Sequence, residues 1–393
     1  MNILGEAFQS EADLIELRRY FHRHPETGWH ESGTRDKIGE VLTEEGIPFF
    51  VACGTGIIAD IAGKNSGERI LGIRADIDAL PVREKTGLPY SSENDGVMHA
   101  CGHDAHIAIL LETAKILNAH RDELKSRVRL IFQPAEEIIS DCGAARMREI
   151  REVRECDRLI GLHVSTLLPA GQASIQAGPV MASADMFDVR ITGKGGHAAH
   201  PDRCTDPVAA AVMFYEGVSR IIAHDLDPIS PAVISITSIR AGHASNVIPD
   251  SASLSGTTRA ADPELRNRFE EILKKIGDSV EKGTGTRVRV TYHRGMPAVI
   301  NDSAAAELGK KAAEEVFGRE NVLPLPFSMG GDDFSHYPNE KAFLFLGCAF
   351  RDPEKNAGLH SPGFDLDEKA MKLGVAWFLQ YVRDWEEENL FIR

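Results

Sequence analysis

Histidine, cysteine and aspartate gather in one nine-residue segment of the chain, MHACGHDAH at 98–106. A cysteine and a histidine two positions apart, here Cys101 and His103, can both face one metal ion where the backbone turns between them. Gly102 between them permits such a turn, because glycine adopts backbone angles that are closed to other residues. A single Cys-x-His also occurs by chance, here as a helix N-terminus with incidental imidazoles. The density of ligand-type side chains makes this segment a candidate metal site.

Two adjacent carboxylates, Glu136 and Glu137, directly follow a predicted strand over 128–132. In open α/β sheets, ligands bind at the carboxyl ends of the strands, so these side chains have a suitable position for chemistry. Successive residues point in different directions, so one glutamate can ligate a metal while its neighbour acts as a general base. Taken alone, the pair is better explained as a solvated acidic pair near the start of a helix.

Two further histidines, His163 and His360, each follow a predicted strand or the loop after one. A single histidine in such a position is more often a hydrogen-bonded structural residue. Here, however, four separate stretches place cysteine, histidine or glutamate at the same edge of one predicted sheet. Five such ligands, one of them shared, could hold two divalent ions about 3.5–4 Å apart and a hydrolytic water between them.

The elements that must position these residues alternate between strand and helix. Apolar runs and 3.6-residue periodicity predict strands and helices in turn, and this alternation favours a mostly parallel sheet with helices on both faces, an α/β fold. The predicted strands are 56–61, 70–75, 128–132, 158–164 and 343–347. The first predicted helix begins at an N-cap at Ser10 and is stopped by Pro25, and the others are 34–45, 103–117, 144–149, 304–317 and 368–386.

The pattern changes between 184 and 294, where the predicted order is β-α-β-β-α-β. This order is typical of the ferredoxin-like α+β unit, which folds as one compact module. The sequence therefore predicts a discontinuous catalytic domain, 1–183 and 295–393, interrupted by a satellite domain, 184–294.

The composition narrows the class of protein. The 393 residues include 44 Lys and Arg against 59 Asp and Glu, a net charge of -15 that disfavours binding to nucleic acid or to an anionic membrane. The longest unbroken apolar stretch is 208–215, far short of the roughly 20 residues of a membrane helix. The first residues include early acids and lack the apolar core of a signal peptide. Six cysteines spread over this length do not form a disulfide scaffold, so we expect reduced thiols. We expect a cytoplasmic enzyme.

An ordered set of motifs connects these observations to a known family. They are HRHPE (22–26), RADIDALP (74–81), MHACGHDAH (98–106), QPAEE (133–137), GLH (161–163), GGHAAHP (195–201), SNVIP (245–249) and LHSP (359–362). This series closely resembles the amidohydrolase branch of the M20 metallopeptidases, whose members cleave N-acyl amino acids, hippurate-like amides or auxin–amino-acid conjugates. The resemblance extends over essentially the whole chain.

The resemblance implies a role for each candidate residue. Cys101 would bridge two divalent ions, with His103 and His163 completing one site and Glu137 and His360 the other. Glu136 would be the general base that activates the hydrolytic water, and Asp76 would orient a ligand from behind it. Zn²⁺ or Mn²⁺ suits this mixture of thiolate, imidazole and carboxylate, with Co²⁺ or Ni²⁺ as alternatives.

Three residues of the satellite domain would complete the site. By resemblance, His197 polarises the scissile carbonyl or stabilises its oxyanion, Asn246 lies in the same neighbourhood, and Arg259 grips a substrate carboxylate. The family often dimerises through this domain, so we expect a homodimer or a higher homo-oligomer. His197 could then act on its own chain or on the partner, and one sequence leaves both open.

One segment departs from the family pattern, because Ile138-Ile139-Ser140-Asp141 stands where several glycines usually follow QPAEE. We expect the bulky side chains to reshape the substrate site rather than the chemistry. The leading hypothesis is a dinuclear amidohydrolase acting on N-acyl-L-amino acids. The alternatives are a dipeptidase with the same site, a binding protein that has kept the fold without turnover, and a zinc-stabilised structural module.

Overall fold

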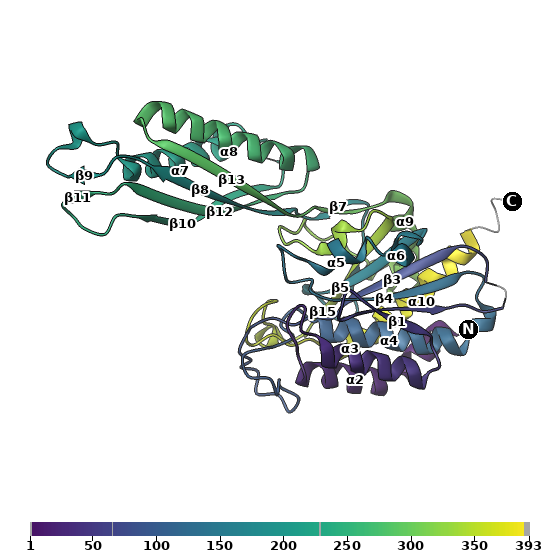
Figure 1. Cartoon of the computed structure of the whole chain (residues 1–393). Helices are drawn as coiled ribbons and strands as arrows, with labels where there is room; N and C mark the ends of the chain where they lie inside the picture. Colours follow the sequence, from purple (N-terminus) through teal and green to yellow (C-terminus); the bar gives the residue numbers. More distant parts are fainter. Residues whose placement is uncertain (1, 65, 228, 389–393) are drawn as a thin grey trace. The chain divides into compact units, whose positions relative to one another are not determined.

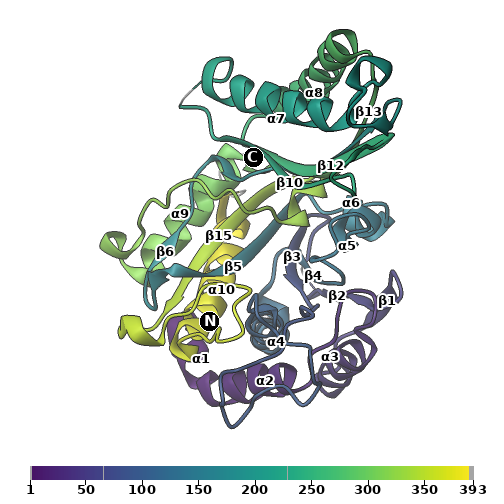
Figure 2. The ribbon, with the colours of Figure 1, turned by 90° about the vertical axis from the view of Figure 1, so that its left-hand side faces the viewer.

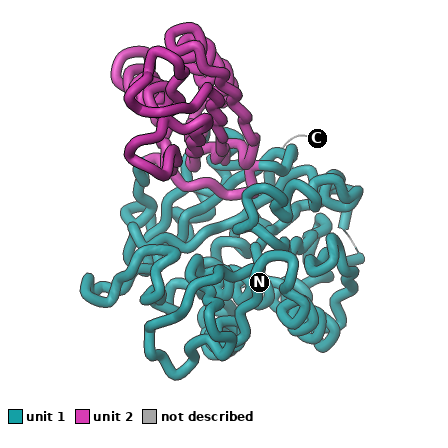
Figure 3. The backbone as a smooth tube through the Cα atoms, turned by 60° about the vertical axis from the view of Figure 1, so that its left-hand side comes forward, with its two compact units in different colours: residues 1–178, 300–326, 336–393 teal, residues 179–299, 327–335 magenta. Residues whose placement is uncertain are grey.

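The computed structural model describes residues 2–64, 66–227 and 229–388, and the chain divides into two compact units (Figure 3). The first unit comprises 1–178, 300–326 and 336–393, and the second comprises 179–299 and 327–335. The sequence predicts domain boundaries at 184 and 294, whereas the units change after 178 and after 299, and the short stretch 327–335 also belongs to the second unit.

The first unit contains a mixed sheet of seven strands in the order β1-β2-β4-β3-β5-β15-β6 (Figures 1 and 2). The four central strands, β4, β3, β5 and β15, run parallel, and β1, β2 and β6 join antiparallel at the two edges. This arrangement confirms the predicted mixed, mostly parallel sheet. The strands are β1 Phe49–Ala52, β2 Gly56–Ile61, β3 Ile70–Asp76, β4 Arg127–Gln133, β5 Arg158–Pro169, β6 Ala173–Ser174 and β15 Glu340–Ala349.

Helices cover both faces of this sheet. On one face α4 and α10 pack side by side, since a Cβ on Gly374 of α10 would lie 3.0 Å from Ile109 of α4 and 3.3 Å from Leu162 of β5. The short helices α5 and α6 lie at the other face, where Arg129 of β4 donates a hydrogen bond to the Glu152 carbonyl of α6. The helices are α1 Ile3–Gln9, α2 Glu11–Arg23, α3 Ser32–Glu44, α4 His103–Ala119, α5 Gly143–Met147, α6 Arg151–Arg154, α9 Ser303–Phe317 and α10 Met371–Glu387.

The second unit has a four-stranded antiparallel sheet in the order β10-β12-β8-β13, with α7 and α8 on one face (Figure 1). This strand order is the ferredoxin-like order that the sequence predicts. Asp206 and Asp262 cap the two helices by accepting hydrogen bonds from the N–H groups of Val208 and Glu264. The elements are β8 Ala184–Thr192, β9 Gly196–His197, α7 Pro207–His224, β10 Ala232–Ala241, β11 Val247–Ile248, β12 Ser251–Ala260, α8 Pro263–Thr284 and β13 Arg287–Met296, with β7 Gly178–Met181 and β14 Val299–Asn301 at the junctions.

Several element boundaries differ from the predictions. A separate helix α1 precedes Ser10, whose hydroxyl donates to the Ala7 carbonyl instead of capping α2. The predicted helix over 368–386 is a 3-10 turn, Glu368–Ala370, followed by α10. Among the described residues, no helix is both long and apolar enough to cross a membrane.

Candidate metal centre

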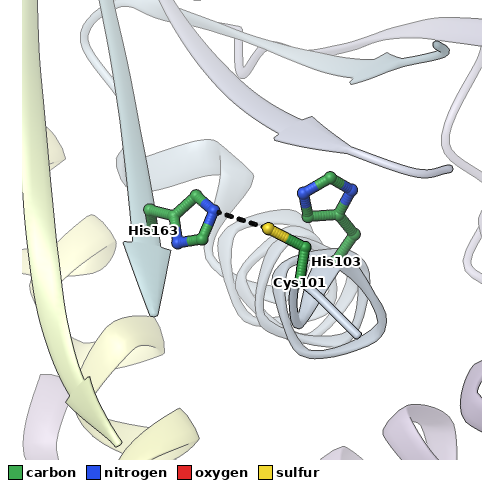
Figure 4. Close-up of side chains that lie close together, drawn as sticks. All are labelled: Cys101, His103 and His163. Atoms are coloured by element: carbon green, nitrogen blue, oxygen red, sulfur yellow. Dashed lines mark hydrogen bonds between the residues drawn. The ribbon is translucent and has the colours of Figure 1, made fainter. Parts of the chain in front are cut away.

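Two elements of the first unit bring three of the predicted ligands together (Figure 4). Cys101 lies just before α4, His103 is the first residue of α4, and His163 lies in β5. The Cys101 Sγ is 3.4 Å from the His163 Nε2, and one ligand atom from each residue lies within 4.8 Å of the others. Gly102 has a φ of 88°, and a Cβ there would lie 2.5 Å from the Val164 side chain, so the close approach requires glycine.

A second group shares Cys101. The His360 Nε2 lies 3.3 Å from the Cys101 Sγ and 3.3 Å from the Glu137 Oε1. His360 has a φ of 64°, a left-handed conformation that is uncommon outside glycine, and its N–H donates to the Ala100 carbonyl at 2.8 Å. A third group joins His103, Glu136 and Glu137 within the same 4.8 Å limit. The structure thus brings all five predicted ligands and Glu136 into one cluster.

Hydrogen bonds fix which nitrogen of each imidazole faces the cluster. The His103 Nδ1 lies 2.9 Å from the Asp78 carbonyl, and the His163 Nδ1 lies 2.7 Å from the Val164 carbonyl. Since a carbonyl accepts, both Nδ1 atoms carry the proton and donate. In the neutral ring each Nε2 is then the lone-pair nitrogen, the arrangement that metal-ligating histidines adopt. Within the described part of the chain, the His103 Nε2 is buried without a hydrogen-bond partner.

His106 and Asp76 lie beside the cluster but are engaged elsewhere. The His106 Nδ1 is 2.6 Å from the Asp76 carboxylate, and the His106 Nε2 accepts a hydrogen bond from the Val164 N–H at 3.0 Å. With both nitrogens used, His106 has no free lone pair for a metal. Asp76 also pairs with Arg74 at 2.7 Å and lies 3.6 Å from the His103 Nε2.

Asp78, which sequence reasoning did not single out, holds the two adjacent glutamates. Its Oδ1 accepts from the Glu136 N–H and its Oδ2 accepts from the Glu137 N–H, both at 3.0 Å. The preceding Ala135 has a φ of 50°, and its N–H donates to the buried Glu31 carboxylate at 2.8 Å. Carboxylate acceptors therefore fix three successive N–H groups of the turn. The feature of the sequence that could have pointed to Asp78 is its position as the second acid of Asp76-Ile77-Asp78, at the end of a predicted strand.

The segment that departs from the family pattern is anchored against residues 28 and 29. Gly28 packs so closely on Ile138 that a Cβ there would lie 2.7 Å from the Ile138 side chain. The Trp29 Nε1 donates to the Asp141 carbonyl at 2.8 Å. Arg146 covers the Trp29 ring at 4.2 Å and pairs with the Asp141 carboxylate. Ile138 therefore contacts Gly28, and its bulk fills space between two segments of the first unit.

The surroundings of the cluster oppose ionisation of the Cys101 thiol. Burial raises the pKa of Cys101 well above its usual value, and the charges of Glu137 and Glu136 raise it further. Burial also lowers the pKa of His163 to about 3, with the nearby His106 adding to the effect. Without a cation in the cluster, the Cys101 thiol holds its proton and His163 is neutral.

Carboxylates act in the opposite direction on the other two histidines. Burial works against a charged His103, but Asp76 and Asp78 outweigh it and raise the pKa of His103 to about 10. The hydrogen bond with Glu137 raises the pKa of His360. Burial on its own would raise the pKa of Glu137, but the hydrogen bond with His360 and the charge of His103 outweigh burial and lower it. The carboxylates of this cluster therefore favour bound positive charge, which without a metal is carried by protons on His103 and His360.

The donor set fits a divalent metal. One sulfur, three imidazole nitrogens and carboxylate oxygens are the ligands that Zn²⁺ and its first-row neighbours accept. A cation would replace the protons on Cys101 and His103, so binding would release protons and strengthen as the pH rises. The buried, unpartnered Nε2 of His103 is a donor atom that a bound ion would satisfy.

The remaining predicted residues belong to the second unit. His197 in β9 is the register partner of Val247 in β11, and the Ala198 N–H donates to the Asn246 carbonyl at 3.1 Å, so the structure places His197 and Asn246 side by side. Arg259 is half-buried near the C-terminal end of β12. Burial lowers the pKa of Arg259, and the charge of Asp185 partly offsets this effect. About eight strand residues, or roughly 26 Å, separate Arg259 from the end where β9 and β11 lie.

Comparison with known proteins identifies the family. The model of peptidase family M20/M25/M40 matches residues 72–384. The chain belongs to this family. An N-acetylcysteine deacetylase from Bacillus subtilis (strain 168) is 38% identical over 369 residues, covering 93% of this chain and 95% of its own. The hippurate hydrolase of Campylobacter jejuni is 30% identical over 382 residues, covering 96% and 98%.

A solved structure of the family supports the same assignment. The Bacillus subtilis YXEP protein, described as a dinuclear metal binding peptidase from the M20 family, aligns with a TM-score of 0.83 and 36% identity over 96% of this chain and 98% of its own. The family expected from the motifs is confirmed, and so is the fold class. This M20 protein is a metal-dependent amidohydrolase with a candidate metal-ligand cluster in its first unit.

Proposed function

We propose that this M20 amidohydrolase hydrolyses the amide bond of N-acyl-L-amino acids and releases a carboxylic acid and a free amino acid. The observation that carries the proposal is the convergence of five ligand side chains and Glu136 in one buried cluster. The relative at 38% identity, named an N-acetylcysteine deacetylase, supports an N-acyl amino acid as the substrate class.

The cluster would hold two divalent ions, either Zn²⁺ or Mn²⁺. The Cys101 Sγ lies 3.4 Å from the His163 Nε2 and 3.3 Å from the His360 Nε2, which supports it as the shared ligand, with His103 and His163 on one side and Glu137 and His360 on the other. Ions bound there would supply Lewis acidity and lower the pKa of the hydrolytic water. The Nδ1 hydrogen bonds of His103 and His163 would hold both rings in the binding orientation.

Glu136 would take a proton from the attacking water and later deliver it to the leaving amine. Its carboxylate has an oxygen within 4.8 Å of ligand atoms of His103 and Glu137, so it is close enough to serve both steps. The Asp78 hydrogen bond to the Glu136 N–H would keep the carboxylate in place between the two proton transfers.

The satellite residues support a role for a second copy of the chain. In an N-acyl amino acid, the scissile carbonyl and the carboxylate lie no further apart than the length of an extended dipeptide, about 7 Å, whatever the acyl group. His197 and Arg259 lie at opposite ends of β12, so one such molecule cannot touch both residues of the same chain. If His197 stabilises the oxyanion and Arg259 grips the substrate carboxylate, the two must come from different copies. Asn246, beside His197, would act from the same copy as His197.

We propose that the copies pair through α7 and the neighbouring edge strand β10. Val208, Val212 and Tyr215 lie on one side of α7 and are 40%, 52% and 47% exposed. Ile239 of β10 is exposed beside them at 48%. An edge strand with free backbone groups next to an apolar helix surface is suited to pairing with its own copy, since a two-fold dimer brings the same patch of both subunits together.

The test combines metal depletion with a substrate panel. Chelator-treated protein should lose amide hydrolysis, and Zn²⁺ or Mn²⁺ should restore it. Acetyl, benzoyl and longer N-acyl amino acids would be compared with dipeptides by measuring the released amine. A higher kcat/KM for dipeptides would replace the proposed substrate class with a dipeptidase. Full activity in protein shown to be metal-free would falsify the metal-dependent reaction.

A further inference from the structure

Arginines form a row across the exposed face of the sheet in the second unit. Arg240 of β10 is the register partner of Ser253 in β12, Ser253 is the partner of Arg190 in β8, and Arg190 is the partner of Arg289 in β13. Register partners project to the same face, and all four side chains are exposed, on the side opposite α7 and α8. Arg287 lies two residues from Arg289 along β13, on the same face and also exposed.

The row places like charges directly opposite one another. Arg190 and Arg289 are paired across antiparallel strands about 5 Å apart, an arrangement that is unfavourable for two cations. Among the described residues, no carboxylate forms an ion pair with Arg190, Arg240 or Arg289. Asp188, the acidic residue next along β8 on this face, is instead paired with His293 at 2.9 Å.

Small side chains leave space between the arginines. The four strands line a hollow of about 420 Å³ whose lining includes Ser251 and Ser253, the arginines Arg190, Arg240 and Arg289, and Asp188, the carboxylate paired with His293. His243, in the loop after β10, also lines this hollow. The chain carries a net charge of -15, so a concentration of unpaired cations on one face is contrary to its overall balance.

We propose that this arginine row, which consists wholly of residues of the second unit, binds a small multivalent oxyanion, either a diphosphate or a phosphate ester. Guanidinium groups match phosphate oxygens in a two-pronged geometry, and a doubly charged anion would neutralise the repulsion between Arg190 and Arg289. Arg240, two strands or about 10 Å from Arg190, would meet the far side of a ligand seated over Ser253.

The test is calorimetric titration of the metal-loaded full chain with inorganic diphosphate at low ionic strength. The double variant Arg190→Ser/Arg289→Ser should bind at least about tenfold more weakly, a loss of about one strong charged contact. Serine already stands in the row at position 253, so the substitution suits the exposed strand. Oxyanions can also bind at the metal cluster, so the titration of both proteins is repeated after metal removal, where the diphosphate that still binds reports on sites outside the cluster.

Arg268, exposed on α8 of the same unit, provides the matched control. Arg268→Ser removes one positive charge from outside the row, as each of the two row substitutions does inside it, and should leave diphosphate affinity unchanged. In anion-free buffer, Arg289→Ser should also melt no lower than the wild type, because it relieves the repulsion. A nucleoside diphosphate that binds as tightly as diphosphate points to the phosphate groups, and one that binds more tightly adds contacts from the organic part.

Three results would overturn the proposal. Equal affinity in the wild type and the double variant would show that the row takes no part in binding. An equal loss in Arg268→Ser would reduce the effect to overall charge. No diphosphate binding by the wild type, together with a changed sedimentation coefficient for the double variant, would make the row a contact between copies of the chain.

Discussion

The Asp78 carboxylate accepts a hydrogen bond from the Glu136 backbone N–H at 3.0 Å. Its second oxygen accepts from the next N–H, that of Glu137, at the same distance, while the Asp78 carbonyl accepts from the His103 Nδ1. One residue thus fixes the proposed base, one proposed ligand and the ring orientation of another. Asp78 therefore positions groups on both sides of the cluster without contributing a ligand atom to the groups found there.

Replacing Asp78 by asparagine should lower activity while the protein remains folded. Asparagine has one side-chain oxygen, so one of the two N–H groups loses its acceptor and the Glu136-Glu137 turn loosens. We expect kcat to fall about 10–100-fold, the usual effect of removing such a supporting group. Steady-state kinetics and metal analysis would be made on the same sample, with circular dichroism as the folding control. Wild-type kcat in Asp78→Asn would show that the turn is held well enough without this carboxylate.

Glu136 and Glu137 have identical chemistry but should give different defects. Glu136→Gln removes the proposed base and should lower kcat about 10²–10⁴-fold with the metal content unchanged. Glu137→Gln removes a proposed ligand, beside His360 and Cys101, and should lower the metal content first. Elemental analysis and kinetics of the two variants give the comparison, each serving as the control for the other. The reverse pattern would exchange the two assignments and leave the family membership intact.

The lowered pKa of Glu84 leads us to expect a specific loss of folding stability in acid. Burial opposes its ionisation, but hydrogen bonds from His22 and from the Ser92 N–H lower the pKa of Glu84 to about 2, from an ordinary value of 4.5. Since the folded pKa is the lower one, ionised Glu84 stabilises the fold above about pH 4.5, and this stabilisation is lost as the pH falls toward 2. Glu84→Gln should therefore be less stable than the wild type at pH 6, with the difference shrinking below pH 4.

Urea unfolding of both proteins between pH 2.5 and 6 would measure this difference. Glu93→Gln is the matched control, because the Glu93 carboxylate is exposed and lies 3.7 Å from an exposed His24. A difference between Glu84→Gln and the wild type that stays constant over the whole pH range would mean that the charge of Glu84 contributes nothing to stability.

The sequence predicted the ligand cluster because its members lie in or after predicted strands of one sheet or at the start of a helix, although His163 lies inside β5 and His360 lies in a turn beyond β15. Cys101, His163 and His360 lie far apart in the chain, but parallel strands end at one edge of the sheet, so position along the strand was sufficient. Asp78 was missed because its role depends on hydrogen bonds to a turn 58 residues away. The two-residue strands β9 and β11 have no periodicity to detect. The arginine row depends on the register of four strands, which single-strand patterns do not contain.

The position of His197 leads to the sharpest test of how the two units cooperate. His197 is exposed at the tip of the second unit, where β9 and β11 extend beyond the main sheet (Figure 1). The five proposed ligands and Glu136 all lie in the first unit, so His197→Ala should lower kcat strongly while the bound metal remains unchanged. Asp202→Ala, an exposed substitution in the following turn, would serve as the control and should keep the wild-type kcat.

Mixing two inactive variants then separates action on the same chain from action on the partner. If His197 acts on the partner, a mixed dimer of His197→Ala and Glu136→Gln contains one site with an intact base and an intact histidine. After full subunit exchange of equal amounts, activity should recover to about a quarter of the wild-type value, because half the dimers are mixed and each has one working site. No recovery, with exchange verified by mass-tagged subunits, would assign His197 to its own chain. A fully active His197→Ala would remove this histidine from the reaction altogether.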